Sequence, residues 1–159
     1  MIADIVYEAT YAHPREAVWR ALTTSELLAA WLMANDLREA RVGHTFRFTD
    51  RPRPFWNGVC SCEVLVADAP SRFELAWGTD APGTATRASW TLAATPDGGT
   101  RLTFCHSGLH GVMGWLMKLG MSKGWRRMVE RSIPFVLDEM TRGRTPTRDA
   151  VKQAALHGA

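Results

Sequence analysis

The chain has 159 residues, 46% of them hydrophobic and 22% charged, a composition typical of one folded domain with a sizeable core. The N-terminus, MIADIVYEATY, lacks the basic region and apolar stretch of a signal peptide, and no apolar run approaches the roughly 18 to 20 residues of a membrane span. We therefore expect a cytoplasmic protein without a membrane span, whose three cysteines are reduced thiols.

The net charge of +3 is unevenly distributed along the chain. Residues 1 to 117 carry 10 basic and 12 acidic side chains, whereas residues 118 to 159 carry 9 and 4. A basic helix face can contact nucleic acid or an anionic surface, but Glu130, Asp138 and Glu139 interrupt the basic residues, which is more typical of a solvated face. We find no nucleic-acid-binding motif and expect no nucleic-acid partner.

The chain begins with a predicted strand followed by two short helices. Residues 2 to 11 alternate between two faces and are rich in β-branched and aromatic side chains, which predicts the strand. Pro14 then favours a helix start, because proline is tolerated at the first helical position. Residues 23 to 26, TTSE, have the pattern of a capping box, which predicts a second helix that ends near Leu32.

Residues 42 to 107 have the two-residue period of half-buried strands. Apolar and polar side chains alternate within each segment, and turn sequences such as Asp97-Gly98-Gly99 separate the segments. Residues 56 to 67 also predict a strand, but they are apolar at both phases, so the pattern leaves the register of this strand open. Hairpin connections of this kind predict an antiparallel sheet of sequential neighbours.

A long amphipathic helix is predicted over residues 122 to 143. At about 100° per residue its apolar side chains, Trp125 among them, fall on one face. Ser122 suits the N-cap, and Gly143 suits the left-handed position after the last turn. Pro134 lies mid-helix, where it lacks an N–H and its ring meets the carbonyl of Glu130, so we expect a kink there.

The segment 109 to 123, LHGVMGWLMKLGMSK, is rich in apolar residues and in glycine. Because each glycine in a helix costs up to about 1 kcal/mol relative to alanine, we expect a mobile or partly helical flap. The alternatives for its apolar side chains are closure of a cavity mouth, a homodimer interface, or burial in the core. Residues 144 to 159 are predicted to form a tail with a short helix over 148 to 157.

The predicted elements follow the order strand, two short helices, five strands and one long helix. A sheet with one apolar face needs a cover, and the long helix is the element able to lie across it. The sequence therefore predicts an α+β fold in which a curved, six-stranded antiparallel sheet grips the C-terminal helix. Residues 1 to 143 are predicted to form this single domain.

Four segments of the chain carry a family resemblance. They are AHPREAVWRALTTSELLAAWL (12 to 32), CEVLVADAPSRFELAWG (62 to 78), GGTRLTFCHSGL (98 to 109) and GWRRMVERSIPFVLDEM (124 to 140). They resemble the START-like, birch-pollen-allergen-like (SRPBCC) helix-grip superfamily, and within it bacterial proteins similar to the activator of the heat-shock-protein-90 ATPase. The resemblance implies the fold and says little of function, because such domains bind or process unrelated ligands. The segment 109 to 123 and Pro134 depart from the family pattern.

The helix-grip resemblance implies an apolar pocket, because the sheet curves away from the helix and the space between them is often incompletely filled. Aromatic stripes at strand spacing are otherwise ordinary core. The residues predicted to contact an apolar ligand are Phe46, Phe48, Phe73, Leu75, Trp77, Trp90, Leu92, Leu102, Phe104, His106, Trp125, Val129 and Ile133.

Glu63 and His106 are the candidate catalytic residues. The resemblance places Glu63 at the start of a GEV-like strand motif and His106 in an HSG motif, at positions that commonly face the cavity. A carboxylate and an imidazole in an apolar pocket have shifted pKa values and can act as acid and base or anchor a ligand. In the structural alternative, His106 makes a hydrogen bond in the core and Glu63 reaches solvent.

The cysteines together with His106 include the ligand types of a zinc site. Three strand steps of about 4.8 Å separate the predicted strands, which puts Cys105 roughly 14 Å from Cys60 and Cys62, far beyond the ~4 Å between two ligands of one metal. We therefore interpret the cysteines as small apolar strand residues and expect no metal and no cofactor.

Three functions follow as hypotheses. The first is binding of a small hydrophobic or aromatic ligand between the sheet and the long helix. The second is an enzyme of the cyclase or hydratase kind that uses Glu63 and His106. The third is a protein-interaction domain similar to the chaperone activator, which works through its surface. No Ser/His/Asp order or glycine-rich phosphate loop is present, so binding is expected rather than catalysis.

Overall fold

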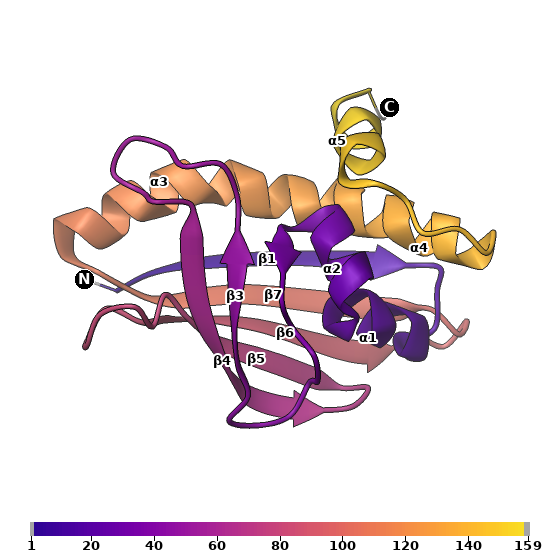
Figure 1. The fold of residues 1–159 in the computed structure, drawn as a ribbon. Helices are drawn as coiled ribbons and strands as arrows, with labels where there is room; N and C mark the ends of the chain where they lie inside the picture. Colours follow the sequence, from indigo (N-terminus) through magenta and orange to yellow (C-terminus); the bar gives the residue numbers. More distant parts are fainter. Residues whose placement is uncertain (1, 158–159) are drawn as a thin grey trace.

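The computed structural model describes residues 2–157, in which a long helix lies across one face of an antiparallel sheet (Figure 1). The strands are β1 (Ile2–Tyr11), β2 (Ala34–Asn35), β3 (Thr45–Thr49), β4 (Val59–Asp68), β5 (Arg72–Trp77), β6 (Thr86–Ala94) and β7 (Thr100–His110). The helices are α1 (Arg15–Thr23), α2 (Ser25–Trp31), α3 (Gly111–Arg127), α4 (Ile133–Thr141) and α5 (Arg148–His157), and a π-helical turn, Met128–Ser132, joins α3 to α4.

The strand order in the sheet is β1-β7-β6-β5-β4-β3-β2, and all neighbours are antiparallel. The predicted α+β helix-grip architecture is confirmed, with two short helices after β1 and a long C-terminal helix over the sheet. The sheet has seven strands rather than six, because Ala34 and Asn35 pair with Thr49 and Phe48 of β3. Two residues are too few to produce a recognisable period, so the sequence did not predict this strand.

The register of β4 explains why its sequence is apolar at both phases. Cys60, Cys62 and Val64 are buried on the inner face of the sheet. The pairing with β5 then shifts between Val64 and Val66. A bulge of this kind places two residues opposite one, so the side chains after it change phase relative to those before it.

The helices α1 and α2 are separated by one extended residue, Thr24. The predicted capping box is wrong, because Thr24 makes no side-chain cap hydrogen bond. The hydroxyl of Thr23 instead donates to the carbonyl of Trp19 at 2.7 Å, and that of Ser25 donates to the side-chain oxygen of Asn35 at 2.9 Å. Both hydroxyl groups therefore donate to these acceptors, and neither caps the N-terminus of α2.

For the segment 109 to 123, expected to be a mobile or partly helical flap, the structure shows regular helix: residues 111 to 123 form the first turns of α3, which continues into the predicted long helix. Ser122 is therefore not an N-cap; it lies within the helix and shares a hydrogen bond with the hydroxyl of Tyr7 on β1. Gly114 is buried where a Cβ would lie 2.5 Å from the backbone carbon of Leu109. Packing on β1 and β7 stabilises this glycine-rich helix, since tertiary contacts outweigh helix propensity.

The helix changes to π-helical hydrogen bonding just before Pro134, the residue at which the sequence predicts a kink. The N–H of Ile133 donates to the carbonyl of Met128, five residues earlier. Pro134 lies in the first turn of α4, where its missing N–H and its ring are tolerated. Gly143 has the predicted left-handed conformation, with φ of 72°. The helix α5 then folds back beside α2 and the π-helical turn (Figure 1).

Candidate functional site

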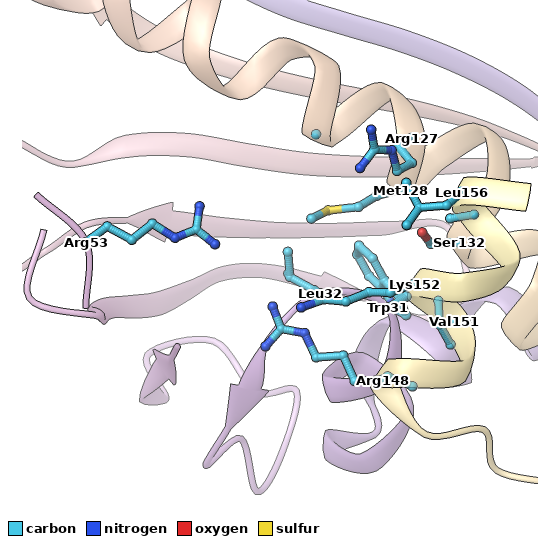
Figure 2. A pocket seen from close by; sticks show the side chains of 13 residues that line it. Trp31, Leu32, Arg53, Arg127, Met128, Ser132, Arg148, Val151, Lys152 and Leu156 are labelled. Carbon is cyan, nitrogen blue, oxygen red and sulfur yellow. The ribbon is translucent and has the colours of Figure 1, made fainter. Parts of the chain in front are cut away.

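A pocket of about 350 Å³ lies between the C-terminal end of α2, the junction of α3 with the π-helical turn, α5, and the loop that joins β3 to β4. Figure 2 shows the side chains that line it. Trp31 and Leu32 come from the end of α2, Met128 from the π-helical turn, and Arg53 from the β3–β4 loop. The volume lies within the roughly 300 to 1,000 Å³ of small-molecule sites.

The helix α5 completes the pocket and is held by contacts with distant parts of the chain. Val151 and Ala155 are buried where α5 packs on α2 and the π-helical turn. The guanidinium of Arg131 donates to the carbonyl of Ala155 at 3.0 Å. At the other end, Arg148 donates to the carboxylate of Asp50, just after β3, at 2.9 Å. These contacts fix one wall of the pocket.

The charged side chains of the pocket are all basic: Arg53, Arg127, Arg148 and Lys152. Figure 2 shows the charged ends of Arg53, Arg148 and Lys152 pointing toward the same space. Asp50 lies 2.9 Å from Arg148 and 3.6 Å from Arg53. Within residues 2–157, neither Arg127 nor Lys152 forms an ion pair. The pocket therefore has an excess of positive charge.

The positive charge of the pocket affects the pKa of Asp50. Its partial burial acts to raise the pKa, but hydrogen bonds from the backbone of Arg51 and the guanidinium of Arg148, together with the charges of Arg148 and Lys152, lower the pKa of Asp50 below its ordinary value. The carboxylate is thus ionised at neutral pH, and it is paired with Arg148 and Arg53. It does not neutralise Arg127.

The apolar wall of the pocket connects to the aromatic core. Trp31 is buried, and its indole N–H donates to the carbonyl of Ala21 at 2.8 Å. Its ring meets that of Trp90 edge-on, with 6.2 Å between the ring centroids. Leu32, Met128 and Leu156 add further apolar side chains to the lining, together with Ala30, Val151 and Ala155. One side of the pocket can therefore contact an apolar group while the other contacts an anion.

The thirteen predicted ligand contacts form the packed interior between the sheet and the long helix, and none of them lines this pocket. All except Trp77, which is half-buried, are buried. The ring of Trp125 fills the centre of this region, 4.3 Å from the ring centroid of Phe104 and 5.4 Å from that of Trp77. Their part in ligand binding stays a prediction.

His106 is buried in this interior. One ring nitrogen, Nε2, lies 2.7 Å from the hydroxyl of Thr86, and the other, Nδ1, has no hydrogen-bond partner among residues 2–157. The rings of Trp77 and Trp125 lie edge-on to the imidazole, each 5.9 Å away. Burial lowers the pKa of His106 to about 4, so the ring is neutral at pH 7.

Glu63 and His106 are not brought together. Glu63 is half-buried on the outer face of β4, because its neighbours Cys62 and Val64 point into the core. His106 lies on the inner face of β7, three strand steps away. At about 4.8 Å per step the two side chains are on opposite faces and roughly 14 Å apart. They cannot act together as acid and base.

The cysteines are likewise divided between the two faces. Cys60 and Cys62 are buried side by side, with 3.9 Å between their sulfur atoms. Cys105 is on the outer face of β7, between the buried Phe104 and His106. Among residues 2–157, no three His, Cys, Asp or Glu side chains are placed to hold a metal ion.

Sequence reasoning missed the basic pocket. The signal was the excess of 9 basic over 4 acidic residues after position 117, which includes Arg127, Arg148 and Lys152. The pattern alone did not show that these side chains converge on one cavity. Their convergence depends on where α5 docks.

The seven-stranded antiparallel sheet, its long covering helix and the two short helices after β1 define a helix-grip domain. The chain belongs to the family described as Activator of Hsp90 ATPase homolog 1-like protein, whose sequence profile matches residues 12–137. No curated protein matches the chain.

Solved bacterial structures share this fold. A protein of Mesorhizobium loti is 29% identical, with a TM-score of 0.73 over 87% of this chain and 98% of that one. A protein of Bacillus halodurans is 30% identical, with a TM-score of 0.70 over 85% and 96%. The solution structure of the Aha1 dimer from Colwellia psychrerythraea is 21% identical, with a TM-score of 0.66 over 80% and 90%.

Proposed function

We propose that this protein binds a small molecule with an apolar body and an acidic group in the pocket between α2, the π-helical turn and α5. The observation that carries the proposal is the pairing of an apolar wall with two cations, Arg127 and Lys152, that make no ion pair within the described chain. This proposal differs in two respects from the prediction of a hydrophobic ligand between the sheet and the long helix. The ligand carries an acidic group, and its site is lined by none of the thirteen predicted contact residues.

Uncompensated positive charge in a concave site attracts anions, because the low-dielectric walls concentrate the field. A carboxylate or phosphate would accept charge-assisted hydrogen bonds from Arg127 and Lys152. The apolar part of the ligand would contact Trp31, Met128 and Leu156. Specificity would then come from the basic groups, and affinity in part from apolar surface removed from water.

Three ligands with the same chain and different head groups test the proposal: octanoate, octanol and octylamine. Titration calorimetry is expected to show one saturable site for octanoate, weaker binding of octanol and none of octylamine. The double substitution Arg127→Gln with Lys152→Gln is expected to weaken octanoate binding at least about tenfold, since a hydrogen bond to a charged group contributes about 1.5 to 3 kcal/mol.

The matched control is Arg101→Gln, which removes an exposed cation from β7, far from the pocket in sequence and outside its lining. Its octanoate affinity is expected to equal that of the wild type. Equal affinity for all three head groups, or an equal loss in the control, would show that the basic side chains do not select the ligand. Absence of saturable octanoate binding would overturn the function.

The predicted homodimer through residues 109 to 123 and the chaperone-activator-like interaction stay predictions. The first is addressed by the oligomeric state of the purified protein. No contact of Glu63 or His106 favours the catalytic hypothesis.

A further inference from the structure

The first half of α3 exposes an apolar surface. Val112 is 75% exposed, Met113 69%, Leu119 57% and Trp115 53%, and Leu116 and Met117 are exposed as well. We call residues 112 to 119 the α3 surface. Single exposed apolar residues are ordinary, but a contiguous group that includes tryptophan marks a site of contact with another molecule or a membrane.

A further exposed apolar residue, Phe55, lies in the β3–β4 loop, which lines another side of the pocket. Phe55 is fully exposed and has φ of 70°, a left-handed conformation that bulky residues rarely adopt. Arg53 of this loop and Gly124 of α3 line the same pocket, so the loop and the helix each form part of its wall. Figure 1 shows the loop rising from β3 and β4 to the level of α3.

The charged residues within these two segments are all basic, although Arg53 pairs with Asp50 just outside the loop segment at 3.6 Å. Residues 110 to 129 contain Lys118, Lys123, Arg126 and Arg127 and no acidic residue, and residues 51 to 58 contain two arginines and no acidic residue. Arg126 pairs with Glu130 at 3.2 Å, whereas Lys118 and Lys123 form no ion pair within residues 2–157. A symmetric dimer through this surface would bring like charges together.

Helices that lie in the interface of an anionic bilayer typically expose Trp, Leu and Met next to Lys or Arg. The α3 surface has this composition and contains no acidic residue. We propose that the α3 surface and the β3–β4 loop dock on an anionic lipid membrane. Phe55 and the apolar side chains of α3 enter the interface, and the basic side chains contact the lipid head groups. The β3–β4 loop and α3 both contribute to the pocket wall, through Arg53 and Gly124.

Docking in this orientation also implies where the ligand comes from. This implication rests on the function proposed above. The pocket would take up an acidic amphiphile, such as a fatty acid, directly from the bilayer. The apolar chain would then pass from lipid to the wall formed by Met128 and Leu156 without crossing water.

Co-sedimentation with vesicles tests the docking. The wild type is expected to bind vesicles of phosphatidylcholine mixed with phosphatidylglycerol, to bind pure phosphatidylcholine at least about tenfold more weakly, and to be released by high salt. Phe55→Ser combined with Leu116→Ser, both exposed and outside the pocket lining, is expected to weaken binding at least about tenfold. Val42→Ser, exposed between β2 and β3, is the control and is expected to bind as the wild type does.

The same double variant is expected to bind octanoate in solution like the wild type, so failure of docking and failure of the pocket are distinguishable. No binding to anionic vesicles, or unchanged binding of the double variant, overturns the proposal. Sedimentation velocity provides a second measurement. A wild-type dimer that Trp115→Ser with Met117→Ser converts to monomer would assign the α3 surface to a second copy of the chain and also overturn it.

Discussion

The hydroxyl of Tyr11 on β1 donates a hydrogen bond to the backbone carbonyl of Val129 in the π-helical turn, at 2.5 Å. In an α-helix this carbonyl would accept from Ile133, but the N–H of Ile133 donates to Met128. The next residue, Pro134, would be the partner in a π-helix and has no N–H. Tyr11 therefore supplies the donor that the helix lacks at this carbonyl.

Tyr11→Phe removes this donor and leaves a buried carbonyl without a partner. We expect a loss of about 1 to 3 kcal/mol in the free energy of unfolding, measured by urea titration. The control is Tyr7→Phe, which removes a partly buried hydrogen bond to Ser122, whose hydroxyl can turn to water. It is expected to cost less than about 1 kcal/mol. Equal losses would show that the Val129 carbonyl finds another donor.

Pro134→Ala restores a backbone N–H at position 134, the residue that would donate to the carbonyl of Val129 in a π-helix. In this background the carbonyl of Val129 can accept from Ala at position 134, so the cost of Tyr11→Phe is expected to fall by about 1 kcal/mol or more. A double-mutant cycle of Tyr11→Phe and Pro134→Ala measures this coupling by urea unfolding. Additive losses would contradict the assignment of Tyr11 as the substitute donor.

Trp125 anchors the long helix on the sheet. It is buried against the rings of Phe104 and Trp77, so Trp125→Ala is expected to lower the free energy of unfolding by about 3 to 5 kcal/mol. Trp115→Ala makes the same chemical change on an exposed part of the same helix and is expected to cost less than about 1 kcal/mol. A small loss at Trp125 would mean that the interior tolerates a cavity there.

His106 makes stability depend on pH. Burial lowers its pKa to about 4, whereas the unfolded chain has the ordinary value of about 6.5. Between these values the unfolded state binds the proton and the folded state does not, so stability falls as the pH falls. From about pH 7 to about pH 4.5 this group alone is expected to remove roughly 2.5 kcal/mol.

The measurement compares urea unfolding of the wild type and His106→Gln at both pH values. The variant is expected to lose about 2.5 kcal/mol less than the wild type over this interval, whatever its stability at neutral pH, because carboxylates contribute equally to both proteins. The same pH dependence in both would show that folding does not lower the pKa of His106.

The sequence by itself determined the elements whose faces follow from local periodicity. Alternation in β7 placed Phe104 and His106 on one face, and the 3.6-residue period placed Trp125 on the buried side of the long helix, because side-chain direction within an element depends only on backbone geometry. The family motifs added the helix-grip arrangement, which the fold confirms. The sequence did not decide whether the aromatic side chains form an ordinary packed core or line a ligand cavity.

Tertiary structure decided the features that depend on residues far apart in the chain. The helix at residues 111 to 123 forms despite its glycines because it packs on β1 and β7. The basic pocket exists because Arg148 reaches Asp50, 98 positions earlier, and Arg131 holds the carbonyl of Ala155. No local period encodes such contacts, since each depends on the packing of complete elements whose positions the rest of the fold determines.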